Sequence, residues 1–217
     1  MTGAQRSRLR LAREGYPHIA GAVALAFLLF ILGWAVAGWL ALALALFVVS
    51  FFRDPERTIP SDPRAIVAPA DGKVIGVKHV QDARFLNGPA TLVSIFMSPL
   101  DVHVNRVPTT GRVVDVRYNA GKYFRAFADK ASLDNEQNAI VLEDEHGRRL
   151  CFVQIAGFLA RRIVCYLHPG MDVERGQRCG MILFGSRVDI YLPLAVHVRV
   201  QVGERVRGGE TVIAQWP

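Results

Sequence analysis

The pattern that decides the fold first appears in residues 66–78, which read IVAPADGKVIGVK. Two short apolar runs, 66–69 and 73–78, lie on either side of a tight turn centred on Asp71 and Gly72. Short apolar runs bounded by Gly, Pro, Asn or Asp are typical of β-strands. Further runs of this kind occur at 91–97, 102–107, 111–118, 139–143, 150–156, 162–167, 181–184, 187–192, 196–202 and 211–216. Many short strands at close spacing predict a mainly β fold, either a sandwich or a barrel.

A weak internal repeat accompanies these strands. Residues 173–177, VERGQ, are echoed by residues 206–210, VRGGE, and each is followed by an apolar run. The dipeptides Asp71-Gly72 and Thr110-Gly111 form two further tight turns into strands. This pattern is similar to the hammerhead turns of biotinyl and lipoyl domains, so we expect such turns in the β fold. Residues 121–134, GKYFRAFADKASLD, are the best candidate for a short helix or a long loop.

The N-terminal part has a different character, because the 34 residues from Ile19 to Phe52 carry no charge. This stretch is too long for the apolar core of a signal peptide, which spans about 7–15 residues. As one straight helix it would measure roughly 51 Å, longer than the hydrocarbon core of a bilayer at about 30 Å. Glycine permits a turn and tryptophan prefers the membrane interface, and both residues occur twice within 33–39. We therefore expect a membrane-embedded helical hairpin with its tip there. One long tilted helix is the alternative.

Basic residues flank the uncharged stretch on both sides: Arg6, Arg8, Arg10 and Arg13 precede it, and Arg53, Arg57 and Arg64 follow it. Because Lys and Arg favour the cytoplasmic side, a hairpin would place both flanks on the cytoplasmic face of the cell membrane, whether it spans the bilayer or is monotopic. Residues 53–63 contain three prolines, so we interpret them as a linker without helix or sheet pairing. The sequence thus predicts an N-terminal membrane domain, 1–52, and a β-rich domain, 53–217.

Composition excludes several classes of protein. Apolar residues make up 51% of the chain and charged residues 21%, which rules out a disordered protein. A net charge of +7 suits an anionic partner such as a lipid surface. Nucleic-acid binding is not expected, because beyond the N-terminus the arginines form no basic run longer than a pair. The three cysteines, Cys151, Cys165 and Cys179, form no CxxC motif, so neither a zinc site nor a disulfide framework is indicated and we expect no metal.

Three separated segments carry the candidate chemistry: 68–74 (APADGKV), 96–108 (FMSPLDVHVNRVP) and 180–188 (GMILFGSRV). Taken singly, each has an ordinary interpretation. Asp before Gly, or Gly before Ser, usually marks a turn. One His between valines on a strand is usually a packed or a surface residue.

In combination, the segments resemble the phosphatidylserine decarboxylase family of pyruvoyl-dependent membrane enzymes. The motifs PADGKV, MSPLDVHVNRVP and LFGSRV follow the order and spacing of that family over about residues 50–217, most closely those of its short bacterial form. The stretches GKYFRAF, NEQNA and QIAGFLARRIV also match.

The resemblance implies that the chain makes its own cofactor. Ser186 Oγ would attack the carbonyl of Gly185, with His103 as the general base and Asp71 orienting and charge-stabilising His103, as in a serine triad. An N-to-O shift and β-elimination would then split the precursor into a β chain, 1–185, and an α chain, 186–217. The two chains would remain together as a heterodimer, with a higher oligomer as a further possibility, and Ser186 would become a pyruvoyl group.

The resemblance also implies the reaction. The pyruvoyl ketone would act as an electron sink by forming a Schiff base with the serine amine of phosphatidylserine, and loss of CO₂ would yield phosphatidylethanolamine. His103 is the candidate donor of the returning proton. Arg161 and Arg162 are candidates for binding the headgroup phosphate or carboxylate. No metal, PLP or nucleotide is required.

The sequence departs from the longer family members at several positions. Phe184 and Arg187 flank the Gly-Ser pair where many of those members have Leu and Thr. Arg106 stands where they carry a second histidine, so the base role falls on His103 alone. If Asp101 and His103 lie on one strand, their side chains share a face, and Asp101 is then an alternative to Asp71 as the histidine's partner.

An interpretation from another class is a non-catalytic, membrane-tethered, biotinyl-like binding or adaptor module. It accounts for the hairpin and the repeat, but it gives no role to Ser186 or His103. A biotinyl carrier would need a lysine at a hairpin tip, and a serine hydrolase would need a GxSxG elbow; the sequence contains neither. We therefore favour a decarboxylase whose partners are phosphatidylserine and anionic membrane lipid.

Overall fold

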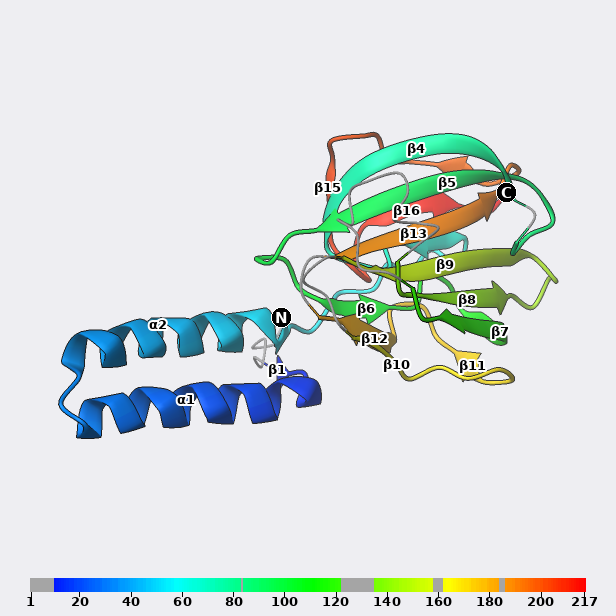
Figure 1. The fold of residues 1–217 in the computed structure, drawn as a ribbon. Coiled ribbons are helices and arrows are strands. Elements are labelled where there is room, and N and C mark those ends of the chain that lie inside the picture. Colours follow the sequence, from blue (N-terminus) through cyan, green and yellow to red (C-terminus); the bar gives the residue numbers. More distant parts are fainter. Residues whose placement is uncertain (1–9, 83, 122–134, 158–161, 184–185) are drawn as a thin grey trace, which may run out of the picture. The chain divides into compact units, whose positions relative to one another are not determined.

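The computed structural model describes residues 10–82, 84–121, 135–157, 162–183 and 186–217. The chain divides into two compact units, Met1–Glu56 and Arg57–Pro217. The first unit is mainly helical, and the second is built of strands (Figure 1). The prediction of a mainly β fold is therefore confirmed for the larger unit.

The first unit contains two apolar helices, α1 (Tyr16–Ile31) and α2 (Ala35–Phe51), after a 3-10 turn at Arg13–Gly15. The helices run antiparallel and side by side (Figure 1). Close packing at their shared end depends on glycine, because a Cβ on Gly38 would lie 2.7 Å from the ring of Phe30.

Most large side chains of the two helices are exposed, among them Phe27, Leu28, Ile31, Val36, Leu40, Leu44 and Leu46. By length and composition, the stretch Arg13–Ile31 is long and apolar enough to cross a membrane, whereas α2, at 17 residues, is shorter. Exposed apolar surface of this extent is typical of a segment that contacts lipid or another protein.

The linker expected at residues 53–63 begins differently from the prediction. Its first two residues form strand β2 (Arg53–Asp54), which pairs antiparallel with β1 (Arg10–Leu11). Pairing is possible because Pro55, which lacks an N–H group, comes only after these two residues.

One eight-stranded sheet forms the framework of the second unit. Its strands, in spatial order, are β11 (Asp172–Val173), β7 (Gly111–Asn119), β8 (Gln137–Glu143), β9 (Arg149–Ala156), β13 (Ser186–Pro193), β5 (Gly88–Met97), β4 (Gly72–Asp82) and β15 (Arg205–Val206). All neighbouring pairs are antiparallel, and the sheet is strongly curved, with β4 and β5 arching over the core (Figure 1).

Two three-stranded sheets complete the unit. One contains β10 (Ile163–Cys165), β12 (Arg178–Ile182) and β6 (Val104–Arg106), and the other β14 (His197–Val198), β16 (Val212–Gln215) and β3 (Ala65–Val67). The main core gathers alternate residues of the large sheet, such as Val93, Ile95, Val188 and Ile190, with residues of both small sheets. Alternation places every second residue of these strands inside.

Several expectations differ in extent, and one lies outside the described residues. The runs 102–107 and 162–167 contribute only the three residues of β6 and of β10, respectively. The run 196–202 contributes only the two residues of β14, because the chain then turns, with the Glu204 N–H donating to the Gln201 carbonyl at 3.2 Å. The candidate helix or loop at 121–134 falls almost entirely on residues that the structure does not describe.

The weak sequence repeat corresponds to an internal two-fold repeat of backbone hydrogen bonds. The N–H of Val67 donates to the carbonyl of Pro108 at 2.9 Å, and reciprocally the N–H of Arg106 donates to that of Pro69 at 2.8 Å. The likeness of this arrangement to the hammerhead turns of biotinyl domains stays a prediction.

The turns named in the sequence occupy equivalent places in this repeat. Gly209 and Gly176 both have positive φ, +81° and +80°, a conformation that favours glycine. Their N–H groups donate to the carbonyls of Ala68 and Val107 at 2.9 and 2.8 Å, respectively. This local repeat therefore has two related halves, which allows residues of one half to be compared with their counterparts in the other.

Candidate active site

Ser186 is the first residue of β13, and its side chain is completely buried. In the sheet it pairs with Met97 of β5 on one side and with Ala156 of β9 on the other. Its Oγ lies 3.5 Å from the Sδ of Met97. The hydroxyl is therefore held in the interior at the end of a central strand.

His103 lies one residue before β6 and is also completely buried. Its Nδ1 lies 3.0 Å from the backbone carbonyl of Asp101. Because a carbonyl only accepts hydrogen bonds, Nδ1 carries the proton in the neutral ring, and Nε2 is left as the basic nitrogen. The carbonyl of His103 in turn accepts a hydrogen bond from Ile182 N–H at 3.4 Å, near the end of β12. His103 is thus attached to the strand that leads toward Ser186.

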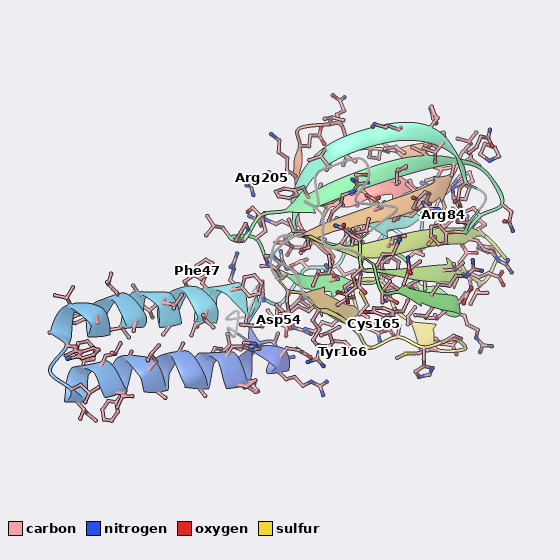
Figure 2. The ribbon with its side chains drawn as sticks, in the orientation of Figure 1. Phe47, Asp54, Arg84, Cys165, Tyr166 and Arg205 are labelled. Atoms are coloured by element: carbon pink, nitrogen blue, oxygen red, sulfur yellow. The ribbon has the colours of Figure 1, made fainter. Side chains whose placement is uncertain are left out.

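Asp101 closes the turn between β5 and β6. Its carboxylate accepts hydrogen bonds from the N–H and hydroxyl of Ser98 at 2.8 and 2.7 Å, and from Arg205 at 3.0 Å. Burial acts to raise the pKa of Asp101, but these hydrogen bonds outweigh it, so the pKa is lowered. Arg205 itself extends from the sheet edge into solvent (Figure 2).

Asp71 immediately precedes β4 and binds other partners. Nη2 of Arg57 lies 3.0 and 2.9 Å from its two oxygens, and the N–H of Gly208 donates to Oδ1 at 2.7 Å. Burial raises the pKa of Asp71, and the lowering by Arg57 and Gly208 offsets this only in part. The charge of Asp101 also raises this pKa.

Comparison across the internal repeat distinguishes two features of Asp71, its hydrogen bond within the turn and its negative charge. Its counterpart in the other half is Thr110, whose Oγ1 accepts a hydrogen bond from the N–H of Arg175 at 3.1 Å, as Asp71 does from Gly208. A side-chain oxygen at this place therefore belongs to the turn, and threonine supplies it as well. What Asp71 adds is a negative charge, which binds Arg57.

The structure shows contacts for several of the expected site residues. The group that contacts Nδ1 of His103 is the backbone carbonyl of Asp101, whereas the carboxylates of Asp101 and Asp71 contact arginines. Arg162 is exposed, and its carbonyl accepts the N–H of Leu183 at 3.2 Å. Gly185 and Arg161 lie outside the described residues. The catalytic and substrate-binding roles stay predictions.

Sequence reasoning missed several buried polar residues near Ser186. Asn105, Gln154 and Asn138 are at most 2% exposed and form hydrogen bonds with one another. A signal was present for Gln154, because it is the one strongly polar residue within the apolar run 150–156. Arg187 and Asp189, which alternate on β13, likewise form a buried ion pair.

Comparisons with known proteins identify the family of the chain. A family model described as phosphatidylserine decarboxylase matches residues 44–214. A phosphatidylserine decarboxylase proenzyme from Syntrophotalea carbinolica is 50% identical over 203 residues, covering 94% of this chain and 95% of that protein. Proenzymes of the same name from Geobacter metallireducens and Nitrosomonas europaea are 45% and 47% identical, covering 98% and 95% of this chain and 100% and 95% of their own lengths. The chain therefore belongs to the phosphatidylserine decarboxylase family.

Proposed function

We propose that this protein is a proenzyme that cleaves itself before Ser186 and then decarboxylates phosphatidylserine to phosphatidylethanolamine and CO₂. The observation that supports the reaction and the pyruvoyl cofactor is family membership over most of the chain. The burial of Ser186 and His103 in the region where β5, β6, β12 and β13 meet supports these two residues as its centre.

In the precursor, Ser186 Oγ attacks the carbonyl carbon of Gly185, and Nε2 of His103 takes the hydroxyl proton. The Nδ1 contact with Asp101 supports this role, because it leaves Nε2 as the acceptor nitrogen. β-Elimination of the ester that results from the N-to-O shift releases the β chain, 1–185, with a free carboxylate on Gly185 and leaves dehydroalanine at the start of the α chain, 186–217. Hydrolysis of the dehydroalanine by water then gives the pyruvoyl group and releases ammonia. Asp71 supplies negative charge for the imidazolium, with Asp101 as the alternative.

The residues around Ser186 fit a pyruvoyl group at that position. Ser186 and its neighbours Met97 and Asn105 are buried, and the amide of Asn105 is a hydrogen-bond donor near the place of the serine side chain. When present, the group supplies an electron sink that stabilises the carbanion left by loss of CO₂.

The protein's own residues then bind the headgroup and handle the proton. Exposed Arg162, together with Arg161, supplies positive charge for the headgroup phosphate or carboxylate. His103, buried with Ser186, returns the proton to the carbon that has lost CO₂.

The membrane arrangement is part of the proposal. The two apolar helices form a membrane-embedded hairpin on the cytoplasmic face of the cell membrane, and the basic flanks contact anionic lipid. The exposed apolar side chains of α1 and α2 support lipid contact. After cleavage, the β and α chains stay together as a heterodimer. The alternative of a non-catalytic adaptor is not favoured, because it gives the family match no role.

Intact-mass spectrometry of the purified protein tests the proposal. Wild-type protein should give two chains, the smaller beginning at position 186 and blocked to N-terminal sequencing. The Ser186→Ala variant should give one uncut chain and release no CO₂ from phosphatidylserine in mixed micelles. A wild-type protein that stays a single 217-residue chain and still decarboxylates would refute the mechanism.

A further inference from the structure

The strand register places two amides on the same face of the sheet as Ser186. Ser186 and Val188 are alternate residues of β13, and Val188 pairs with Gln154 of β9. Gln154 in turn pairs with Asn138 of β8. Because alternate residues of a strand share a face, Ser186, Gln154 and Asn138 all point toward the main core.

These amides are linked in one direction. The Nδ2 of Asn138 donates to Oε1 of Gln154 at 3.1 Å, and the Nε2 of Gln154 donates to Oδ1 of Asn105 at 2.9 Å. An amide whose oxygen accepts a hydrogen bond has its NH₂ group on the opposite side, so each of these contacts fixes the orientation of the accepting amide. The NH₂ group of Asn105 is therefore directed toward Met97, where its Nδ2 lies 3.8 Å from Sδ.

Met97 lies between Asn105 and Ser186 and contacts both. Its sulfur accepts from Asn105 at 3.8 Å and from the hydroxyl of Ser186 at 3.5 Å, and the whole residue is buried. A thioether is a weak acceptor, so these contacts fix the positions of the two donor groups and contribute little free energy. Burying three amides in a core costs free energy that apolar side chains would not cost, so a role beyond packing is expected.

We propose that Asn138, Gln154 and Asn105 form a positioning chain that acts through Met97 to hold the side chain of Ser186 in one rotamer in the uncut precursor. The proposal rests on the self-cleavage proposed above and adds the groups that prepare its nucleophile. A side chain held in one rotamer begins attack from a single geometry, whereas misplacement by about 1 Å can cost about 100-fold in rate.

The decisive variant is Asn105→Asp, which keeps the shape and the acceptor but removes the N–H donor. At neutral pH we expect precursor cleavage to slow by about 10- to 100-fold. Protonation of the new carboxyl restores a donor, and burial raises the pKa of such a group. The cleavage rate relative to wild type should therefore rise as the pH falls. The recovery is attributed to the donor, and not to the fold, where it occurs over a pH range in which the circular dichroism spectrum and the melting temperature of the variant stay constant.

Two further variants act on the same chain. Met97→Leu conserves volume but removes the sulfur, and Gln154→Glu removes the donor that orients Asn105; both should slow cleavage at neutral pH. Exposed Asn119 and Gln201 provide matched controls, because Asn119→Asp and Gln201→Glu make the same chemical changes away from the site. Both controls should cleave at the wild-type rate.

Cleavage is followed as the fraction of uncut chain on denaturing gels, with circular dichroism to verify folding at each pH. Wild-type rates and pH profiles for both Asn105→Asp and Met97→Leu would overturn the positioning chain. Should Asn105→Asp not fold, Met97→Leu and Gln154→Glu decide in its place. Wild-type protein that never cleaves is a separate result, since it refutes the proposed function itself.

Discussion

Breaking the ion pair between Arg187 and Asp189 should destabilise the β unit strongly. Nε and Nη2 of Arg187 each lie 2.6 Å from one oxygen of Asp189, and the two side chains are 6% and 0% exposed. Both residues belong to β13, immediately after Ser186, so both remain on the same chain after the proposed cleavage.

The magnitude follows from the geometry. At 2.6 Å and an effective dielectric constant of about 20, the Coulomb attraction is about 6 kcal/mol, much of which offsets the cost of burying two charges. Asp189→Asn removes the attraction but leaves the guanidinium buried, which costs about 3–5 kcal/mol in comparable pairs. For a protein of this size the melting temperature should fall by about 6–20 °C.

Thermal unfolding in detergent, followed by circular dichroism, measures this change. A Ser186→Ala background keeps every variant uncut. The double variant Arg187→Met/Asp189→Leu should recover most of the lost stability, because it leaves no charge in the core. If Asp189→Asn melts within about 2 °C of the Ser186→Ala protein, the free energy of unfolding has fallen by less than about 1 kcal/mol. The ion pair would then not be a buried one.

Three shorter predictions concern the site. His103→Ala should slow precursor cleavage by at least about 100-fold, as expected for loss of a general base, while gels of a variant that cleaves normally would reassign that role. Asp71→Thr, which copies Thr110, should keep the turn and the melting temperature better than Asp71→Ala. If the carboxylate of Asp71 serves cleavage, both variants should remain uncut. Normal cleavage of Asp71→Thr would show instead that Asp71 is only a turn residue. Because the pKa of Asp101 is lowered on folding, its ionised form stabilises the fold at neutral pH, and this contribution is lost as the pH falls through the folded-state pKa. Asp101→Asn should thus melt below wild type at pH 7 and approach it in acid, and a gap that is constant with pH would contradict this linkage.

The strands of the large sheet could be predicted closely because turn residues mark their ends. The expected run 111–118 became Gly111–Asn119, and 150–156 became Arg149–Ala156. The two-residue strands β11 and β15 could not be found, since nothing local distinguishes them from turns. Their pairing depends on partners far away in the sequence.

The sequence names the candidate site residues but does not reveal their contacts. Ser186 and His103 stand in recognisable motifs, and the structure shows both buried. The partner of Asp71, Arg57, lies in a proline-rich segment that local patterns mark only as a linker. Similarly, Asn105 and Gln154 meet only because β6 packs over the sheet, which no local spacing reveals.

The position of β13 between β9 and β5 has a consequence for the life of the mature enzyme. The proposed cleavage ahead of Ser186 would leave both hydrogen-bonded ladders of β13 intact, so the cleaved protein would keep the fold of the precursor. Once denatured, however, the cleaved protein would be two separate polypeptides, one of them only 32 residues long. Renaturation is then a second-order encounter that dilution disfavours. A mature enzyme that unfolds would therefore rarely regain its activity, and lasting activity would require new synthesis of the uncut chain.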